Sequence, residues 1–492
     1  MKYSALILAA GSGKRISEKF NYPKCLIKIN KKSIIERQIE SYIHANIKNI
    51  FIATGYQSKK ISNVISKYKK NANIKLIHNK IYYKTNNMYS AHLAAKYLKN
   101  TKFILSNGDV VIDKNIVRKL IEGKNDNEIM VDTNYFDEES MKVLFDSKKK
   151  IKKISKKIKK SKKSYTSIDF YKFSKKASVS LFDTIEVFLK KNGQNHWTEV
   201  AIQKLFNKFN FFPNKVLNDK WFEIDTYKDF VSASNKFNNT SDKIFKNYKN
   251  FIVDIDGTTF RKGNPIIGTK DFLNKIEKYK KKIFFLSNNS SMDFTKFYKL
   301  FSKVNFNLKK KNMIISTDIV ISYLKRKKIS RVYATGNKIF LNQLKINKIK
   351  IDYRHPQLAI ISYDDQINYK KLETLCKIIN KGINFIATHD DPFYPSEDGP
   401  IPDAGSIIKL VEITTGKKPL LIFGKPSPQI KKFIRLNGKT IMIGDKIDKD
   451  IKFAKNCGYD SALVLSGTEK KIFNFKEDVT PNYILSSIKD LS

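Results

Sequence analysis

Short apolar runs alternate with helical patterns along the first hundred residues. Residues 3–10 are an apolar run long enough for one buried parallel strand. Apolar residues then recur at helical spacing from the expected N-cap, Ser33, to Asn46. Further strands are expected at 48–54, 74–78 and 102–105, with a helix that begins near 86–90 and ends at Leu98 before the last strand. This alternation predicts a parallel sheet with helices on both faces, whose ligands bind beyond the carboxyl ends of the strands.

A glycine-rich turn follows the first strand. Gly11 and Gly13 interrupt the apolar run, and Arg15 and Lys24 add cations nearby. Backbone N–H groups in such a turn can cradle phosphate. A bare Gly-x-Gly is weak evidence, because it is often only a strand-to-helix turn. The full string is far more specific. It comprises Leu8, Ala9, Ala10, Gly11, Gly13 and Arg15, followed by Pro23, Lys24 and Leu26.

This string resembles the signature of sugar-phosphate nucleotidylyltransferases, particularly the small cytidylyltransferase branch that uses phosphocholine and similar alcohol phosphates. The resemblance implies CTP as a substrate and Lys24 and Arg15 as catalytic cations. An acid at the end of a buried strand can hold Mg²⁺ against a triphosphate. The family has its metal-binding acids where this chain has Asp109 and Asp225, with Glu223 as the alternative to Asp225. The residues implied at the nucleotide are Leu8, Ala9, Ala10, Gly11, Gly13, Lys24, Gly55, Asn87, Ser90 and Gly108.

Three later segments follow in the order seen in that family. They are residues 141–143, 168–174 and 197–199, which we expect to line the acceptor side. A phosphate oxygen of the acceptor would attack the α-phosphorus of CTP and release pyrophosphate, which needs charge neutralisation and positioning more than a base. Nothing in these segments identifies the acceptor.

A polar, Asn-rich stretch at 232–250 precedes a new apolar strand. We therefore expect a first domain over 1–236, a linker over 237–249 and a second domain over 250–492. The new strand ends in Asp254 and Asp256, which project from the same side because side chains two apart on a strand share a face. The first can attack phosphorus as a nucleophile, and the second can act as general acid and base.

Three further strand ends carry polar groups in the second half. The strands 282–286, 420–423 and 440–443 lead to Ser287–Ser291, Lys425 and Asp445. This order resembles the haloacid dehalogenase (HAD) phosphatase superfamily over 250–490. The resemblance implies a nucleophile at Asp254, an acid/base at Asp256, and phosphate contacts at Ser287, Asn288 and Lys425. It also implies Mg²⁺ at Asp254, at the backbone carbonyl of Asp256 and at Asp445. Asp450 would be a weaker ligand.

The stretch between Ser291 and Lys425 is too long for a loop. Strand-like runs at 331–335, 358–362 and 384–387 and a helix around 369–379 predict a small α/β cap domain at about 328–418. Segments at 388–395, 398–400 and 402–406 resemble the class IIA cap of the p-nitrophenyl-phosphatase type. That family often has Asn-Pro-Asp where this chain has His389-Asp390-Asp391. The expected fold class is α/β, with two doubly wound Rossmann-like domains and this cap.

The charge suggests a different class of partner. The 492 residues include 95 Lys or Arg and 46 Asp or Glu, a net charge of +49 that would suit nucleic acid. The lysines are spread along the chain among many Ile and Asn, as in AT-rich coding sequences. The densest run, 148–163, has no interleaved aromatic residues, so we expect a solvated loop or helix face. We expect no stable nucleic-acid partner.

Three further features bear on location. Three widely separated cysteines fit a reducing compartment, and no eighteen-residue apolar stretch predicts a membrane span. The first strand begins at once, so we expect no signal peptide and a cytoplasmic protein. A homo-oligomer remains open.

The sequence thus predicts a bifunctional enzyme that acts on small phosphate esters and a nucleotide, with Mg²⁺ at both sites. A cytidylyltransferase for a polyol, glycerol or choline-like phosphate is fused to a phosphatase, in one surface-polysaccharide precursor pathway. The alternative for the first half is a sugar-1-phosphate uridylyl- or thymidylyltransferase. The other alternative is a basic nucleic-acid-binding protein in which both sites are vestigial.

Overall fold

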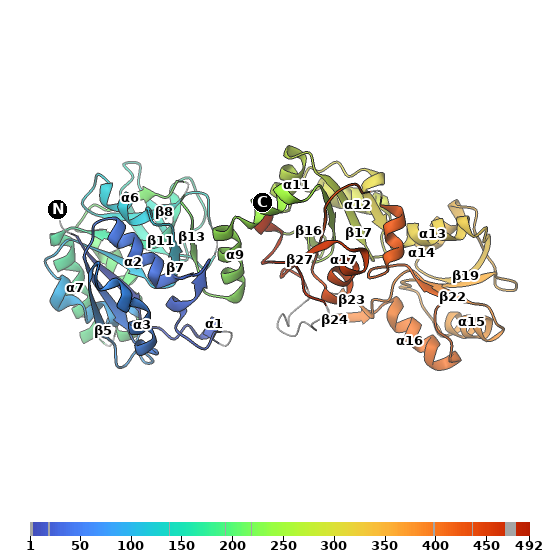
Figure 1. Ribbon diagram of the computed structural model, residues 1–492, viewed down its shortest axis with the longest axis horizontal. Helices are drawn as coiled ribbons and strands as arrows, with labels where there is room; N and C mark the ends of the chain where they lie inside the picture. Colours follow the sequence, from blue (N-terminus) through green and yellow to red (C-terminus); the bar gives the residue numbers. More distant parts are fainter. Residues whose placement is uncertain are drawn as a thin grey trace. The chain divides into compact units, whose positions relative to one another are not determined.

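The computed structural model describes residues 3–17, 20–136, 138–191, 193–217, 219–396, 399–434, 436–467 and 479–492. The chain divides into two compact units, 1–238 and 239–492 (Figure 1). In the described residues, no helix is both long enough and apolar enough to cross a membrane.

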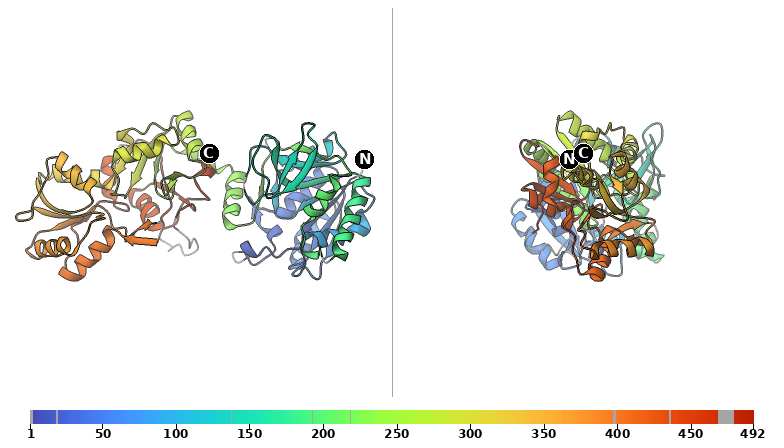
Figure 2. Two further views of the ribbon diagram at one scale, coloured as in Figure 1. Left: turned by 180° about the vertical axis from the view of Figure 1, so that it is seen from behind. Right: turned by 90° about the vertical axis from the view of Figure 1, so that its right-hand side faces the viewer.

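The first unit is built on a nine-stranded sheet. Its parallel part has the order β6-β1-β4-β5, as the alternation of strand and helix predicts. The sheet continues antiparallel through β11, which pairs with β6, β8 and β9; Figure 2 shows it from behind. The strands are β1 Ser4–Ala9, β4 Asn49–Thr54, β5 Asn73–His78, β6 Phe103–Asn107, β8 Glu128–Asp132, β9 Lys142–Phe145, β10 Ile151–Ser155, β11 Ser164–Phe173 and β12 Phe212–Lys215.

Two short ribbons and nine helices accompany this sheet in the described part of the unit. The ribbons pair β2 Lys28–Ile29 with β3 Lys32–Ser33, and β7 Val110–Ile112 with β13 Trp221–Glu223. The helices are α1 Lys14–Ser17, α2 Ile34–His44, α3 Ser58–Ile65, α4 Asn87–His92, α5 Ala95–Leu98, α6 Ile116–Glu122, α7 Lys175–Lys190, α8 Thr198–Leu205 and α9 Tyr227–Asn238.

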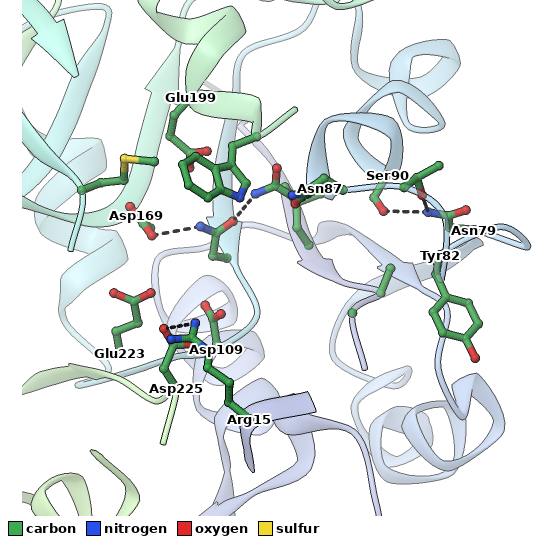
Figure 3. A pocket seen from close by; sticks show the side chains of 18 of the residues that line it. Arg15, Asn79, Tyr82, Asn87, Ser90, Asp109, Asp169, Glu199, Glu223 and Asp225 are labelled. Atoms are coloured by element: carbon green, nitrogen blue, oxygen red, sulfur yellow. Dashed lines mark hydrogen bonds and ion pairs between the residues drawn. The ribbon is translucent and has the colours of Figure 1, made fainter. Parts of the chain in front are cut away.

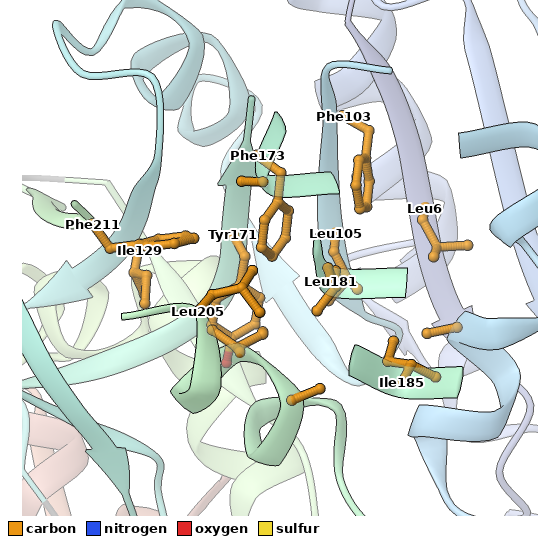
Figure 4. Packing of buried hydrophobic residues seen from close by; sticks show 14 of the residues in the cluster. Leu6, Phe103, Leu105, Ile129, Tyr171, Phe173, Leu181, Ile185, Leu205 and Phe211 are labelled. Atoms are coloured by element: carbon orange, nitrogen blue, oxygen red, sulfur yellow. The ribbon is translucent and has the colours of Figure 1, made fainter. Parts of the chain in front are cut away.

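Buried side chains on both faces of the sheet fix the strand ends in place. On one face, Leu6 and Leu105 pack in one cluster with Leu181 of α7 and Leu205 of α8 (Figure 4). The intervening residues Ala5 and Ile7 belong to a second cluster with Ile35 and Ile39 of α2. This alternation is the period of two expected for a strand covered on both sides. The polar residues therefore lie beyond this packing, at the carboxyl ends of β1 and β6.

Two ranges differ from the sequence expectations. The lysine-rich run 148–163 contains the edge strand β10, not only a solvated loop or helix face, because Ile151 and Ile154 are buried. A bulge between Ile151 and Lys153 explains their helix-like spacing. The expected linker 237–249 contains helix α10, Thr240–Asn247, whose Ile244 and Phe245 are buried in the core of the second unit.

The second unit has two main sheets. Six parallel strands have the order β18-β17-β14-β26-β27-β28, and five more have the order β20-β19-β21-β22-β25. The second sheet lies in sequence between β18 and β26, where a cap domain is expected. Its last strand, Leu421–Ile422, lies beyond the expected limit of 418.

The strands of the first sheet are β14 Asn250–Val253, β17 Lys282–Ser287, β18 Met313–Ile315, β26 Thr440–Gly444, β27 Asp460–Val464 and β28 Tyr483–Leu485. Those of the second are β19 Arg331–Thr335, β20 Lys350–Ile351, β21 Leu358–Ile361, β22 Phe385–Ala387 and β25 Leu421–Ile422. Two ribbons pair β15 Phe260–Arg261 with β16 Asn264–Pro265, and β23 Phe393–Ser396 with β24 Gly399–Pro402. The helices are α10, α11 Thr269–Lys278, α12 Phe294–Ser302, α13 Ser316–Arg326, α14 Lys338–Ile346, α15 Tyr369–Asn380, α16 Ala404–Thr415 and α17 Lys452–Cys457.

Candidate active sites

A cleft of about 280 Å³ lies beyond the carboxyl ends of β1 and β6 in the first unit. Figure 3 shows its polar side chains, with Asp109, Glu223 and Asp225 gathered together. The lining residues are Leu8, Ala10, Gly11, Arg15, Asn79, Tyr82, Thr85, Asn86, Asn87, Ser90, Asn107, Asp109, Met141, Lys156, Asp169, Trp197, Glu199, Glu223 and Asp225.

Lys24 and Arg15 pair with acids of this cleft. Lys24 Nζ lies 2.9 Å from Asp109 Oδ2 and 2.5 Å from Asp225 Oδ1. Arg15 Nη2 lies 2.7 Å from Asp225 Oδ2, and Nη1 lies 3.1 Å from Glu139 Oε2. Burial alone would raise the pKa of Asp225, but Lys24 and Arg15 hold that pKa below its usual value. Asp225 is therefore a carboxylate at neutral pH.

The acids of the cleft fit a divalent cation. Asp109, Glu223 and Asp225 each offer an oxygen, and these atoms lie within 4.8 Å of one another. Asp109 Oδ1 is buried and has no hydrogen-bond partner among the described residues. Burial, with the charges of Asp169, Asp109 and Asp225, raises the pKa of Glu223 well above its usual value. A bound Mg²⁺ would supply the positive charge that this oxygen set lacks. Glu223 thus lies with Asp109 and Asp225, although the sequence favours it less.

The residues expected at the nucleotide separate into two groups. Five of them line the cleft, namely Leu8, Ala10, Gly11, Asn87 and Ser90, whereas Ala9, Gly13, Lys24, Gly55 and Gly108 do not. A Cβ on Gly55 would lie 2.6 Å from the Ala10 carbonyl oxygen and from Tyr82 Cβ. A Cβ on Gly108 would lie 2.8 Å from the Leu8 carbonyl oxygen. These two glycines let the loops of the cleft approach β1.

Sequence reasoning missed a buried acidic network at the same cleft. Tyr171 Oη lies 2.8 Å from Asp169 Oδ1 and 3.1 Å from Glu199 Oε1, and Asn107 Nδ2 donates to Asp169 Oδ2 at 2.9 Å. Burial raises the pKa of Asp169 to about 6 and that of Glu199 to about 7. Both lie in segments expected on the acceptor side. An acid between the apolar residues Ile168 and Phe170 of β11 was the signal available for Asp169.

The second unit places a lysine between two buried acids. Lys425 Nζ lies 2.5 Å from Asp254 Oδ1 and 2.6 Å from Asp450 Oδ1. Thr258 Oγ1 donates to the other oxygen of Asp254 at 3.1 Å. Burial, with Asp450 and Asp445, raises the pKa of Asp254 well above its usual value despite Lys425. Asp254 follows β14, Lys425 follows β25, and the other two acids follow β26, so three strand ends meet here.

This second cluster also fits a divalent cation. Oxygens of Asp254, Asp445 and Asp450 lie within 4.8 Å of one another, and Lys425 pairs with two of these acids. Gly257 and Gly467 make room for Asp445, since a Cβ on either would lie 2.5 Å or 1.7 Å from its Oδ2. A bound Mg²⁺ would supply charge neutralisation for these carboxylates and a phosphate. Asp450 joins the cluster directly, whereas the expected ligand Asp256 does not join it through its side chain.

Family models match both halves of the chain. Residues 5–170 match the MobA-like NTP transferase domain. Residues 251–350 match haloacid dehalogenase-like hydrolases, and residues 422–491 match a HAD-hydrolase-like model. The chain joins a MobA-like NTP transferase domain to a HAD-like hydrolase domain.

Individual relatives cover about half of the chain. Sugar-phosphatase AraL of Bacillus subtilis is 28% identical over 249 residues, 49% of this chain and 91% of that protein. An acid sugar phosphatase of Staphylococcus haemolyticus is 28% identical over 254 residues, 50% of this chain and 95% of that protein. The solved p-nitrophenyl phosphatase of Archaeoglobus fulgidus is 28% identical, covers 50% of this chain and 98% of its own, and has a TM-score of 0.47.

The other expected residues of the hydrolase domain surround Lys425 and Asp256. Asn288 Oδ1 accepts from the Lys425 backbone N–H at 2.7 Å, so it positions the lysine. Ser287 Oγ accepts from the Asn289 N–H at 3.0 Å, and Asn289 Nδ2 donates to Asp256 Oδ2 at 3.2 Å. Asp256 is an exposed residue. Even so, desolvation by the surrounding protein raises the pKa of its carboxyl above the usual value. A raised pKa suits a general acid.

The His389-Asp390-Asp391 triplet ties the cap segment to the loop after β26. Asp391 Oδ1 pairs with Lys446 Nζ at 2.9 Å, and Asp390 Oδ1 pairs with Lys449 Nζ at 2.6 Å. His389 is buried, with its ring nitrogens 2.9 Å from Thr388 Oγ1 and 3.0 Å from Asp403 Oδ1. This residue therefore has structural partners within the cap. Asp398 of the expected cap signature lies outside the described residues.

Proposed function

We propose that the transferase domain, residues 1–236, moves CMP from CTP to a phosphorylated alcohol. A phosphate oxygen of the acceptor attacks the α-phosphorus, the bond from that phosphorus to the bridging oxygen breaks, and pyrophosphate leaves. Lys24 and Arg15 offset the negative charge that develops, and Asp109, Glu223 and Asp225 would hold Mg²⁺. Gly11 and Ala10 lie where a backbone turn can meet the phosphates.

The observation that carries this proposal is the set of opposite charges at the ends of β1 and β6. Lys24 contacts Asp109 and Asp225, which belong to segments far apart in sequence, and a buried oxygen of Asp109 has no hydrogen-bond partner among the residues that the structure describes. A triphosphate with a divalent cation would satisfy both the cations and this oxygen. The choice of CTP over other nucleotides rests on the resemblance of the first strand and its glycine turn to the cytidylyltransferase signature.

We further propose that the hydrolase domain, residues 250–492, cleaves a phosphate monoester. Asp254 attacks phosphorus to form an aspartyl-phosphate, while Asp256 protonates the oxygen of the leaving alcohol. Asp256 then takes a proton from water as that water attacks the aspartyl-phosphate and releases phosphate. Lys425 offsets charge on the nucleophile and phosphate. The sugar phosphatases among its relatives support a sugar phosphate as its substrate. We propose that this reaction and the nucleotidyl transfer belong to one surface-polysaccharide precursor pathway.

Pyrophosphate release tests the first activity most simply. Each of the four ribonucleoside triphosphates, and dTTP, is offered with each of a set of alcohol phosphates, to wild type and Asp109→Asn. We expect CTP-dependent release that falls at least about a hundredfold in the variant. Release that persists in Asp109→Asn, or that requires UTP or dTTP, would contradict the proposal.

A further inference from the structure

Two buried carboxylates line the transferase cleft beyond the three acids assigned to Mg²⁺. Asp169 and Glu199 are 6% and 4% exposed, and both border the cleft. In the part of the chain that the structure describes, neither forms an ion pair with a Lys, Arg or His. Burying a carboxylate without a cation is costly, so such groups gather at functional sites.

The backbone holds Asp169 in a strained conformation. Its φ is 57°, in the left-handed region that residues with a Cβ rarely adopt. It lies where the register of β11 against β8 shifts, between Ser167 and Tyr171. Ser167 and Asn107 also contact its two oxygens, at 3.2 and 2.9 Å. Backbone strain of this kind persists where the surrounding structure fixes it, often at ligand sites. Here it turns Asp169 toward the cleft (Figure 3).

We propose that Asp169 and Glu199 bind hydroxyl groups of the acceptor, which is therefore a polyol phosphate. This inference rests on the nucleotidyl transfer proposed above and names its second substrate. Each carboxylate offers several lone pairs, and their protein partners are neutral Tyr, Ser and Asn groups. Adjacent hydroxyls on one carbon chain can donate to both carboxylates at once. A substrate with one or no hydroxyl cannot.

The neighbouring aromatic side chain argues against a quaternary ammonium acceptor. Trp197 lines the cleft and is 44% exposed, the arrangement that could form one wall of a cation-binding box. Lys156 Nζ lies 5.1 Å from the centroid of its ring. A trimethylammonium group on that face would meet a positive charge. Lys156, which also lines the cleft, can instead meet the phosphate of the acceptor.

A primary ammonium group is the main competitor for these carboxylates. It would form strong charge-assisted bonds if both were ionised. Both are enclosed, and Tyr171 Oη lies within hydrogen-bond distance of each, so they share one polar network. Burial raises both pKa values toward neutral pH, which weakens the attraction for a cation but leaves hydrogen bonds to hydroxyls intact.

Acceptor kinetics test the inference. Pyrophosphate release is measured at saturating CTP with glycerol 3-phosphate, a hexitol phosphate, phosphocholine and phosphoethanolamine, for wild type, Glu199→Gln, Asp169→Asn and Glu186→Gln. Glu186 is a matched acid on α7, paired with Lys190 on the surface. We expect kcat/KM for a polyol phosphate at least about tenfold above the other two acceptors. We expect both cleft variants to raise KM for it about tenfold while KM for CTP changes less than twofold.

The control should match wild type, and tryptophan fluorescence of each variant should show a folded transferase domain, because both tryptophans lie there. Preference for phosphocholine or phosphoethanolamine would overturn the inference and leave cytidylyl transfer standing. Equal changes in KM for CTP and for the polyol phosphate would overturn it too, since they would indicate a merely structural role. Absence of transfer to every acceptor would contradict the proposed function and the inference with it.

Discussion

The two sites each set a lysine between acids, but they differ in burial. The Lys425 side chain is 4% exposed, and its partners Asp254 and Asp450 are 8% and 1% exposed. In the transferase cleft, Lys24 is 14% exposed, and its partners Asp109 and Asp225 are 27% and 17% exposed. The hydrolase charges are thus fixed before a small phosphate arrives. The transferase charges border an open cleft, which under the proposed reaction would admit a triphosphate and a second substrate together.

The largest expected effect is the loss of the buried nucleophile. Asp254→Asn should lower phosphate release from p-nitrophenyl phosphate by about a thousandfold or more, because an amide cannot form the aspartyl-phosphate. Asp448→Asn is the matched control, since Asp448 is 72% exposed in the helical turn Ile447–Ile451 that carries Asp450. It should keep near-wild-type activity. Equal activity of Asp254→Asn and wild type would show that Asp254 is not the nucleophile.

Stability should separate the two lysines. Lys425→Met leaves buried acids uncompensated and should destabilise the hydrolase domain by about 3–5 kcal/mol. Lys24→Met should cost the transferase domain about 1–2 kcal/mol, because water still reaches its partners. Urea unfolding measures both, since Trp197 and Trp221 report on the first unit alone and circular dichroism reports on both. Equal losses would contradict the contrast in burial.

The acidic network of the cleft predicts a pH effect on stability. The pKa of Glu199 rises from 4.5 to about 7 on folding, so the folded state binds more protons than the unfolded state between these values. The free energy of unfolding should therefore fall as pH rises from 4.5 to 7. Glu199→Gln removes this loss and should gain about 2 kcal/mol relative to wild type between pH 5 and 8. A pH-independent difference, followed by tryptophan fluorescence, would contradict the burial argument.

The smallest expected change in stability concerns the glycine turn. In the described part of the chain, a Cβ on Gly11 meets no atom within 4 Å, so Gly11→Ala should alter stability by less than about 0.5 kcal/mol. Gly11 lines the cleft, and the added methyl should still raise KM for CTP about tenfold. Gly55→Ala is the contrasting variant, because its Cβ would lie 2.6 Å from backbone and should destabilise the fold. An unchanged KM for CTP in Gly11→Ala would show that the glycine turn does not belong to the nucleotide site.

Much of the parallel sheet architecture could be predicted because it follows from local patterns. The apolar runs at 3–10 and 102–105 become β1 and β6, and the strand at 331–335 has the expected limits. Each strand is buried on both faces and ends at a polar turn, so its position can be recognised in the sequence. The acids Asp109, Asp225, Asp254 and Asp445 stand at or near such turns.

The remaining features depend on contacts between distant segments. Asp169 and Glu199 meet only because β11 runs antiparallel beside β6 and α8 packs on the same sheet. The pairing of Asp390 with Lys449 needs the cap segment to reach the loop after β26. The bulge in β10 gives this strand a residue spacing typical of a helix or a solvated segment, so the sequence did not reveal it as a strand. The spacing of apolar and polar residues within a single segment does not reveal such contacts between distant segments.

The most direct test of two separate phosphate chemistries is a crossed assay on the full chain. Asp109→Asn and Asp254→Asn are each measured for CTP-dependent pyrophosphate release with a polyol phosphate and for phosphate release from p-nitrophenyl phosphate. Asp109→Asn should lose the first activity and keep the second, and Asp254→Asn should do the reverse. A variant that loses both activities, or one that loses neither, would contradict the account.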